Sequence, residues 1–129
     1  PEGLTAISRL ARVFSTATQI RVRLEFGDVK WHFNDVQSDV LYHFIQEGLI
    51  NSFRHGKATD ISVLFHEDDE WTAVRILDNG RGVLKVQEGI GIAGMRERAI
   101  TIGGKVEIRT IVDGFSVTLY VPRNRMGMK

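Results

Sequence analysis

Residues 40–55 read VLYHFIQEGLINSFRH, and this stretch decides the fold. Val40 and Phe44 lie on one line of a helix, and the next two positions on that line are Glu47 and Asn51. A carboxylate and an amide in an apolar stripe cost free energy unless another group pairs with them. Their placement indicates a ligand, a metal ion or water against this face. The alternatives are that the face reaches solvent near the helix end, or that Asn51 caps a neighbouring loop.

A second departure from an apolar pattern occurs in residues 71–82, which read WTAVRILDNGRG. Ile76 and Asp78 share one face of a strand by period two, so a carboxylate stands where an apolar side chain is expected. Gly80 and Gly82 follow almost directly. Because Asp-Asn-Gly is also a common turn sequence, an ordinary strand exit remains an alternative.

A glycine-rich segment, residues 89–95 with the sequence GIGIAGM, precedes a predicted helix. Gly89, Gly91 and Gly94 let a ligand approach the backbone closely, and the free amides at the start of a helix suit phosphates. The spacing fits the dinucleotide fingerprint G-x-G-x-x-G. A long loop precedes it and a hairpin follows it, however, which excludes a Rossmann unit. A P-loop is excluded because the sequence has no Gly-Lys-Ser or Gly-Lys-Thr.

The four histidines show no metal-ligand spacing, and solvated or packed side chains are the default interpretation for three of them. His55 differs because it lies one helical turn beyond Asn51, beside Arg54 and Lys57. It is either a cation stabilised at the C-terminus of the helix or a ligand contact.

Composition limits the classes of protein to consider. A chain of 129 residues with 43% hydrophobic and 26% charged residues fits one globular domain, residues 1–129, with a real core. Lys and Arg (17) nearly balance Asp and Glu (16), so the charge gives no support for nucleic-acid binding. The absence of cysteine excludes disulfides, thiolate metal sites and cysteine nucleophiles. Without a bilayer-length apolar run or a signal peptide, a cytoplasmic location is expected.

The pattern of apolar residues and turn signals predicts an α+β fold. A two-layer α/β sandwich is expected, with a mixed, mostly antiparallel sheet and helices on one face. Residues 1–19 are read as a linker or lead-in helix of a fragment of a longer chain, and residues 123–129 as a frayed tail. The predicted elements are a helix over 4–14, a hairpin of 20–26 and 29–33, a helix from Asn34 or Asp35 to about Arg54, strands over 61–66 and 71–77, a loop over 78–94, a helix over 95–102, and a hairpin of 105–111 and 115–121.

The three polar signals occur in one order, and together they resemble the Bergerat-type (GHKL) ATP-binding domain of gyrases, heat-shock chaperones, mismatch-repair proteins and sensor histidine kinases. The resemblance runs from about residue 20 to 122. Residues 46–55 look like the N box, 78–82 like the first glycine box and 89–95 like the second. The sequence GMRERA followed by IGG closely resembles the histidine kinase subfamily that pairs with NarL/FixJ-type response regulators.

The resemblance implies a role for each matching residue. Asn51 is implied as the magnesium ligand, and Glu47 as the catalytic residue that orients or deprotonates a group at the γ-phosphate of ATP. Asp78 is implied to accept a hydrogen bond from the adenine amino group, with Gly80 and Gly82 shaping the base pocket. Departures are mild, because the subfamily usually has alanine where this chain has Gly48 and Gly56.

Further residues are implied along the nucleotide. Arg54 and His55 are expected along the phosphates and ribose, and Thr118 on the last strand is expected to back the adenine through water. A short lid over residues 83–88 is expected to hinge on three glycines, which also present amides to the phosphates: Gly89, Gly91 and Gly94.

The resemblance also implies an activity and partners. The chain is expected to bind ATP and Mg²⁺ as a monomer and to transfer phosphate to a histidine on a dimerisation segment of the same full-length protein. A response regulator is then an indirect partner, and a membrane anchor in the full-length protein is left open. Two rival interpretations are an anti-sigma-factor-type serine kinase and an ATP-gated interaction module with little turnover. A gyrase-like machine is disfavoured because its lids are longer.

Overall fold

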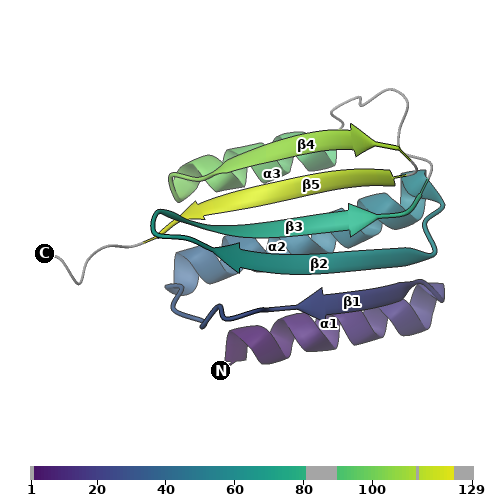
Figure 1. The fold of residues 1–129 in the computed structure, drawn as a ribbon, viewed down its shortest axis with the longest axis horizontal. Helices are drawn as coiled ribbons and strands as arrows, with labels where there is room; N and C mark the ends of the chain where they lie inside the picture. The colour runs from purple at the N-terminus through teal and green to yellow at the C-terminus, as the bar shows by residue number, and fades with distance from the viewer. Residues whose placement is uncertain (1, 81–89, 113, 124–129) are drawn as a thin grey trace, which may run out of the picture.

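The computed structural model describes residues 2–80, 90–112 and 114–123 (Figure 1). No helix in these ranges has the length and apolar character that crossing a bilayer requires. The elements in these ranges are the helices α1 (Glu2–Thr18), α2 (Asp35–Asn51) and α3 (Ile90–Thr101), the π-helical turn η1 (Ser52–Gly56), and the strands β1 (Arg21–Glu25), β2 (Asp60–Glu67), β3 (Trp71–Asp78), β4 (Lys105–Ile111) and β5 (Gly114–Pro122).

The strands form one sheet in the order β1-β2-β3-β5-β4. β1 runs parallel to β2, and the other neighbours pair antiparallel. The helices α1, α2 and α3 all lie on one face of this sheet (Figure 1). The predicted α+β class, with two layers and a mixed, mostly antiparallel sheet, is confirmed.

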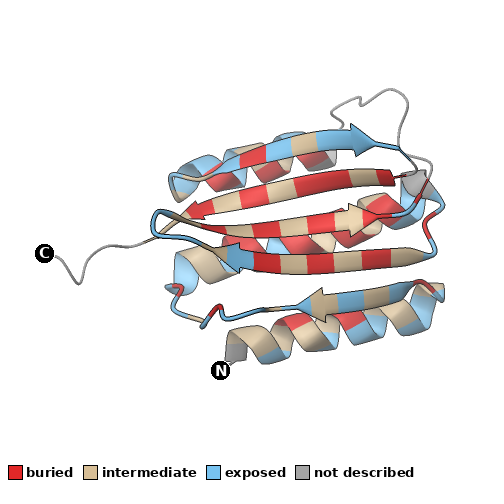
Figure 2. Cartoon of the chain, viewed as in Figure 1, coloured by how far each residue is buried: buried red, intermediate tan, exposed pale blue. Residues whose placement is uncertain are grey.

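The core lies between the sheet and the helices. Buried and half-buried positions alternate along β2 and β3, as the banding in Figure 2 shows, because every second side chain faces the helix layer. Val63 and Val74 on the strands and Leu41 and Ile45 on α2 are fully excluded from solvent. Ile7 of α1 belongs to the same core, so the lead-in helix packs on the domain.

The long helix begins where the sequence predicts. Asn34 is its N-cap: the Oδ1 atom accepts from the Gln37 backbone N–H at 2.8 Å, and the Gln37 Oε1 atom accepts from the Asn34 N–H at 3.0 Å. This reciprocal pair is a capping box, which satisfies two backbone donors that the helix itself leaves free.

One predicted element is wrong. Residues 29–33 do not form the second strand of a hairpin, because β1 instead pairs in parallel with β2 through the crossover that α2 provides. Val29 and Phe33 are nevertheless buried in the core, and the Trp31 indole donates to Ser38 Oγ at 3.2 Å. The period-two pattern therefore reports alternate side chains that pack on the core, in a segment that pairs with no strand among the described residues.

The packing around Gly48 explains why this chain has glycine where the subfamily usually has alanine. This residue is buried on the face of α2 that packs against β3. A Cβ atom added here would overlap the Ile76 δ1 methyl group. The Ile76 side chain thus fills the space that an alanine would take.

Candidate functional site

The α-helix α2 ends at Asn51, and the chain continues as the π-helical turn η1. The sequence analysis predicted one α-helix to about Arg54. The structure differs, because the α-helix changes to a π-helical turn after Asn51. Ser52 is the first residue of this turn. Its N–H still donates to the Gly48 carbonyl oxygen four residues earlier, as in an α-helix, so its side chain continues the buried face of α2.

Glu47 and Asn51 lie one turn apart on α2, and both are half-buried. Among the described residues, neither side chain has a hydrogen-bond or ion-pair partner. Side chains at i and i+4 of a helix are neighbours, so their oxygen atoms face the same space. The two oxygens are therefore open to a ligand on this face.

Asp78 ends β3 with its carboxylate turned into the protein, where the residue is only 5% exposed. Its Oδ2 atom accepts from Ser52 Oγ at 2.7 Å, and its Oδ1 atom accepts from the Gly80 backbone N–H at 2.9 Å. The hydrogen bond from Ser52 joins the polar end of α2 to the end of β3, although 26 residues separate them in sequence. A carboxylate has about four lone-pair positions, so these two contacts leave acceptor capacity for a ligand.

Asn79 holds the strand exit in place from the other side. Its Oδ1 atom accepts from the backbone N–H groups of Thr59 and Asp60, both at 3.0 Å, and its Nδ2 atom donates to Thr59 Oγ1 at 2.9 Å. The Asp60 carboxylate is bound in turn by Arg21, whose hydrogen bond lowers the pKa of the Asp60 carboxyl. Asn79, which directly follows Asp78, thus fixes the start of β2 against the end of β3.

Strand β5 approaches Asp78 closely. Phe115 is directly opposite Asp78 in the antiparallel register, on the same face of the sheet, and packs against the core. A Cβ atom added to the preceding residue, Gly114, would lie 2.5 Å from the Asp78 carbonyl oxygen. Glycine at this position therefore permits the approach that sets Phe115 beside the carboxylate.

Gly114→Ala is expected to lower the thermal unfolding midpoint, because the new Cβ meets a backbone atom that cannot move without shifting β3. Overpacking of this kind costs about 1–3 kcal/mol. Circular dichroism melting measures the change. Gly94→Ala is the matched control, since its Cβ would meet only the end of the Arg98 side chain, at 3.4 Å. Equal midpoints for Gly114→Ala and the parent would contradict the close approach.

The structure contradicts one predicted site residue. Thr118 lies directly opposite Arg75 and Glu107 in the register. It is three residues from Phe115 and therefore on the other face of the sheet, away from the helices and Asp78. The prediction that Thr118 backs the base beside Asp78 is wrong, and Phe115 lies in that place instead.

The structure describes some of the predicted site glycines and not others. Helix α3 begins at Ile90, five residues before the predicted start, so Gly91 and Gly94 lie within the helix. Gly80 is buried beside Asp78. Gly82, Gly89 and the predicted lid over 83–88 lie outside the described residues.

The two basic residues of the N box lie on η1. Arg54 is exposed, and His55 is placed on the turn by its backbone, with its side chain outside the described part of the structure. Both residues follow shortly after Ser52, which contacts Asp78, so their backbone lies near the same end of the sheet as Asp78. Their contacts with phosphate or ribose stay a prediction.

A magnesium ion suits the donor set at the end of α2. No cluster of three His, Cys, Asp or Glu side chains that could hold a metal by itself occurs within the described residues. Mg²⁺ keeps several waters and is commonly bound by one or two protein oxygens together with substrate phosphates. The uncommitted Asn51 amide and Glu47 carboxylate oxygens fit that requirement.

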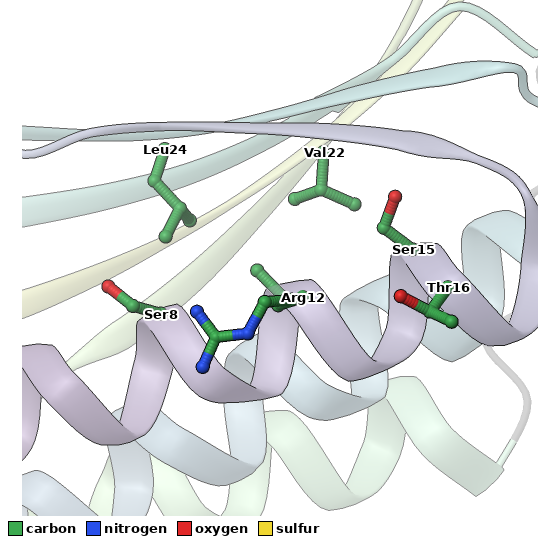
Figure 3. A pocket seen from close by; sticks show the side chains of 7 residues that line it. Ser8, Arg12, Ser15, Thr16, Val22 and Leu24 are labelled. Carbon is green, nitrogen blue, oxygen red and sulfur yellow. The ribbon is translucent and has the colours of Figure 1, made fainter.

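A separate hollow lies between α1 and β1 (Figure 3). Its volume is about 340 Å³. The figure shows Val22 and Leu24 of β1 above it and Arg12 of α1 below. None of the predicted site residues lines it, so it is not part of the candidate site.

Comparison with known proteins shows the family of the chain. The profile of the histidine kinase-, DNA gyrase B-, and HSP90-like ATPases matches residues 36–125, which include the α2 face, the β3 exit and Phe115. This match and the two-layer α/β fold together define the class of the chain as an ATPase domain. The chain belongs to the histidine kinase-, DNA gyrase B-, and HSP90-like ATPase family.

Its sequence relatives are sensor kinases. Sensor protein VraS of Staphylococcus saprophyticus is 34% identical over 91 residues, which are 67% of this chain and 26% of the relative. Sensor histidine kinase LiaS of Bacillus subtilis is 31% identical over 104 residues, which are 74% of this chain and 29% of the relative. The chain therefore spans less than a third of the length of these curated relatives.

Solved structures share the fold. A blue-light activated histidine kinase domain of Erythrobacter litoralis aligns with a TM-score of 0.79 and 17% identity, covering 95% of this chain and 61% of that one. Histidine kinase AdeS of Acinetobacter baumannii aligns with a TM-score of 0.78 and 11% identity, covering 96% and 64%. Full-length ShkA in complex with AMPPNP has a TM-score of 0.76 and 16% identity, covering 89% and 28%.

Three residues of the site were missed from sequence. Asn79 carried no pattern of its own. Ser52 extends the buried line of Leu41, Ile45 and Gly48 on α2, but that line does not identify its hydrogen-bond partner. Phe115 had a readable signal: Val117, Leu119 and Val121 form the buried line of β5, and extending that line backwards reaches residue 115.

Proposed function

We propose that this chain is the ATP-binding catalytic domain of a sensor histidine kinase. The observation that carries the proposal is the buried hydrogen bond between Ser52 and Asp78, which supports it by holding the end of α2, just after Asn51, against the inward carboxylate of β3. Family membership and the AMPPNP bound in the ShkA structure support a nucleotide as the ligand.

Each group of this chain has a task in the proposed reaction. Asp78 accepts from the adenine amino group and orients the base, while Glu47 faces the phosphate end. In phosphotransfer the bond from the γ-phosphorus to the bridging oxygen breaks, a bond to an imidazole nitrogen forms, and ADP leaves. Glu47 is the candidate to orient that imidazole or take its proton.

Magnesium is proposed as part of the bound nucleotide. When present, Mg²⁺ neutralises charge on the phosphates, and Asn51 is the residue that would hold it, with Glu47 nearby. Arg54 and His55 add positive charge or hydrogen bonds on the phosphate and ribose side. The glycines Gly89, Gly91 and Gly94 are proposed to support the phosphates through backbone amides, and Gly82 to shape the base pocket with Gly80.

The proposed partner is a phosphoacceptor histidine on a dimerisation segment of the full-length protein. A response regulator, proposed to be of the NarL/FixJ type on the GMRERA and IGG sequences, would then receive the phosphate. A membrane anchor elsewhere in the full-length protein is compatible with this proposal.

Isothermal titration is expected to show one ADP or ATP bound per chain, with ATP binding dependent on added Mg²⁺. Light scattering on the same sample is expected to report a monomer, because the dimerising segment is proposed to be separate. Absence of binding of both nucleotides at millimolar concentration would rule out the proposed function.

A further inference from the structure

We infer that Ser52 is a specificity-determining residue for the purine base, because it orients the Asp78 carboxylate and offers the base only a hydrogen-bond acceptor. The inference rests on the proposed function, since it assumes a nucleotide base beside Asp78. It starts from one contact: Ser52 Oγ lies 2.7 Å from Asp78 Oδ2, and each residue is only 5% exposed.

The direction of this hydrogen bond follows from the chemistry of the two groups. A carboxylate oxygen accepts and does not donate, whereas a serine hydroxyl has one proton and two lone pairs. The Ser52 proton is therefore committed to Asp78. The lone pairs of the hydroxyl are what remains for any third group at this place.

Both members of the pair are held in position by the backbone. The Ser52 N–H donates to the carbonyl oxygens of Gly48 and Leu49 at the end of α2. On the other side, the Gly80 N–H fixes Asp78 Oδ1 at 2.9 Å. With one carboxylate oxygen bound to Gly80 and the other to Ser52, the carboxylate has a single orientation before any ligand arrives.

The resulting site offers acceptors only. Adenine presents a 6-amino group, which donates, and therefore matches the Asp78 carboxylate and the Ser52 lone pairs. Hypoxanthine and guanine present a 6-oxo group, which would place an oxygen atom against these oxygens. A buried polar site rejects a ligand that leaves its groups unpaired much more strongly than an apolar pocket rejects an extra methyl group.

The test compares ADP with IDP, which has a 6-oxo group in place of the 6-amino group and a hydrogen on N1, where adenine has a lone pair. The parent chain is expected to prefer ADP. Ser52→Ala should lower ADP affinity by about 10-fold or more, because the carboxylate loses the donor that orients it. Its IDP affinity should change much less, so that the ratio of the two dissociation constants falls. Isothermal titration measures all four affinities.

Two further variants separate specificity from general damage. Ser62→Ala, a matched control on β2, should keep the parental ratio, because Ser62 faces the other side of the sheet. Ser52→Thr retains a hydroxyl donor and should restore most of the ADP preference, whereas Ser52→Cys, with a weak thiol donor, should not. If Ser52→Ala fails to fold, as thermal melting would show, the Thr and Cys variants decide the question.

The outcomes distinguish this inference from the proposed function. A parent chain that binds neither nucleotide contradicts the proposed function. Two outcomes would overturn only the role of Ser52 in a parent chain that prefers ADP. One is that Ser52→Ala keeps the parental ratio of the ADP and IDP dissociation constants. The other is that Ser52→Thr and Ser52→Cys have equal ratios. A reduced ratio in Ser52→Ala and Ser52→Cys, with a parental ratio in Ser52→Thr, supports it.

Discussion

Glu47→Gln is expected to bind ATP nearly as well as the parent chain and to transfer phosphate about 10² to 10⁴ times more slowly, the usual loss when general-base assistance is removed. Glutamine keeps the shape of glutamate but cannot take a proton. The Glu47 side chain has no partner among the described residues, so the substitution breaks no contact within them. The defect should therefore appear in the transfer rate and not in folding.

The assay requires a phosphoacceptor histidine, supplied in the full-length protein or as a separate dimerisation segment. Transfer from radiolabelled ATP gives the rate, and isothermal titration gives ATP affinity for the same variant. Glu25→Gln is a suitable control, because Glu25 is exposed at the end of the edge strand β1 and its carboxylate pairs only with Arg23 among the described residues.

Asn51→Asp separates the two residues of this helix face. A carboxylate at position 51 adds negative charge beside the phosphates and the proposed magnesium ligand, so Mg²⁺-dependent ATP binding should change, in contrast to Glu47→Gln. If Glu47→Gln transfers phosphate at the parental rate while Asn51→Asp binds ATP and Mg²⁺ normally, this face of α2 is structural and the catalytic assignment fails.

The layers of the fold could be predicted because burial imposes periodicity on the sequence. Val74 and Ile76 of β3 face the core, and Asp78 follows on the same face of the strand. The pattern therefore left two alternatives: either the Asp78 carboxylate points inward, or the strand ends before it. The structure shows the inward carboxylate. Periodicity does not identify the hydrogen-bonded neighbour, however. The alternation over 29–33 was therefore misread as a strand, whereas β1 pairs with β2 across a helix.

The site was predicted best where a polar residue interrupts an apolar line. Glu47, Asn51 and Asp78 each do so. Thr118 does not: it lies between the buried residues Val117 and Leu119, and its own pattern assigns it to the opposite face. Family resemblance suggested a role that the register denies. Ser52 follows Leu41, Ile45 and Gly48 on the buried line of α2, but helical spacing could not show that its partner is Asp78, 26 residues away.

Asp78→Asn is expected to weaken ADP binding by about 10-fold to 100-fold, and to do so by reversing the hydrogen-bond pattern of the site. The Gly80 N–H needs an acceptor, so the single amide oxygen of asparagine should stay on the Gly80 side. The NH₂ group then faces Ser52, whose hydroxyl must accept from it and is left with a free proton. Donors now stand where the parent chain has acceptors, and the charge that strengthens the contact with adenine is lost.

A consequence follows that loss of charge alone would not produce: IDP should lose less affinity than ADP, or gain some, because its 6-oxo group accepts from these donors. Titration of ADP and IDP into Asp78→Asn measures both effects. Asp69→Asn, an exposed substitution in the turn at the opposite end of β3, serves as the control for removing one negative charge. Parental ADP affinity in Asp78→Asn would show that Asp78 merely ends a strand. Equal losses for ADP and IDP would instead show that its charge acts without selecting the base.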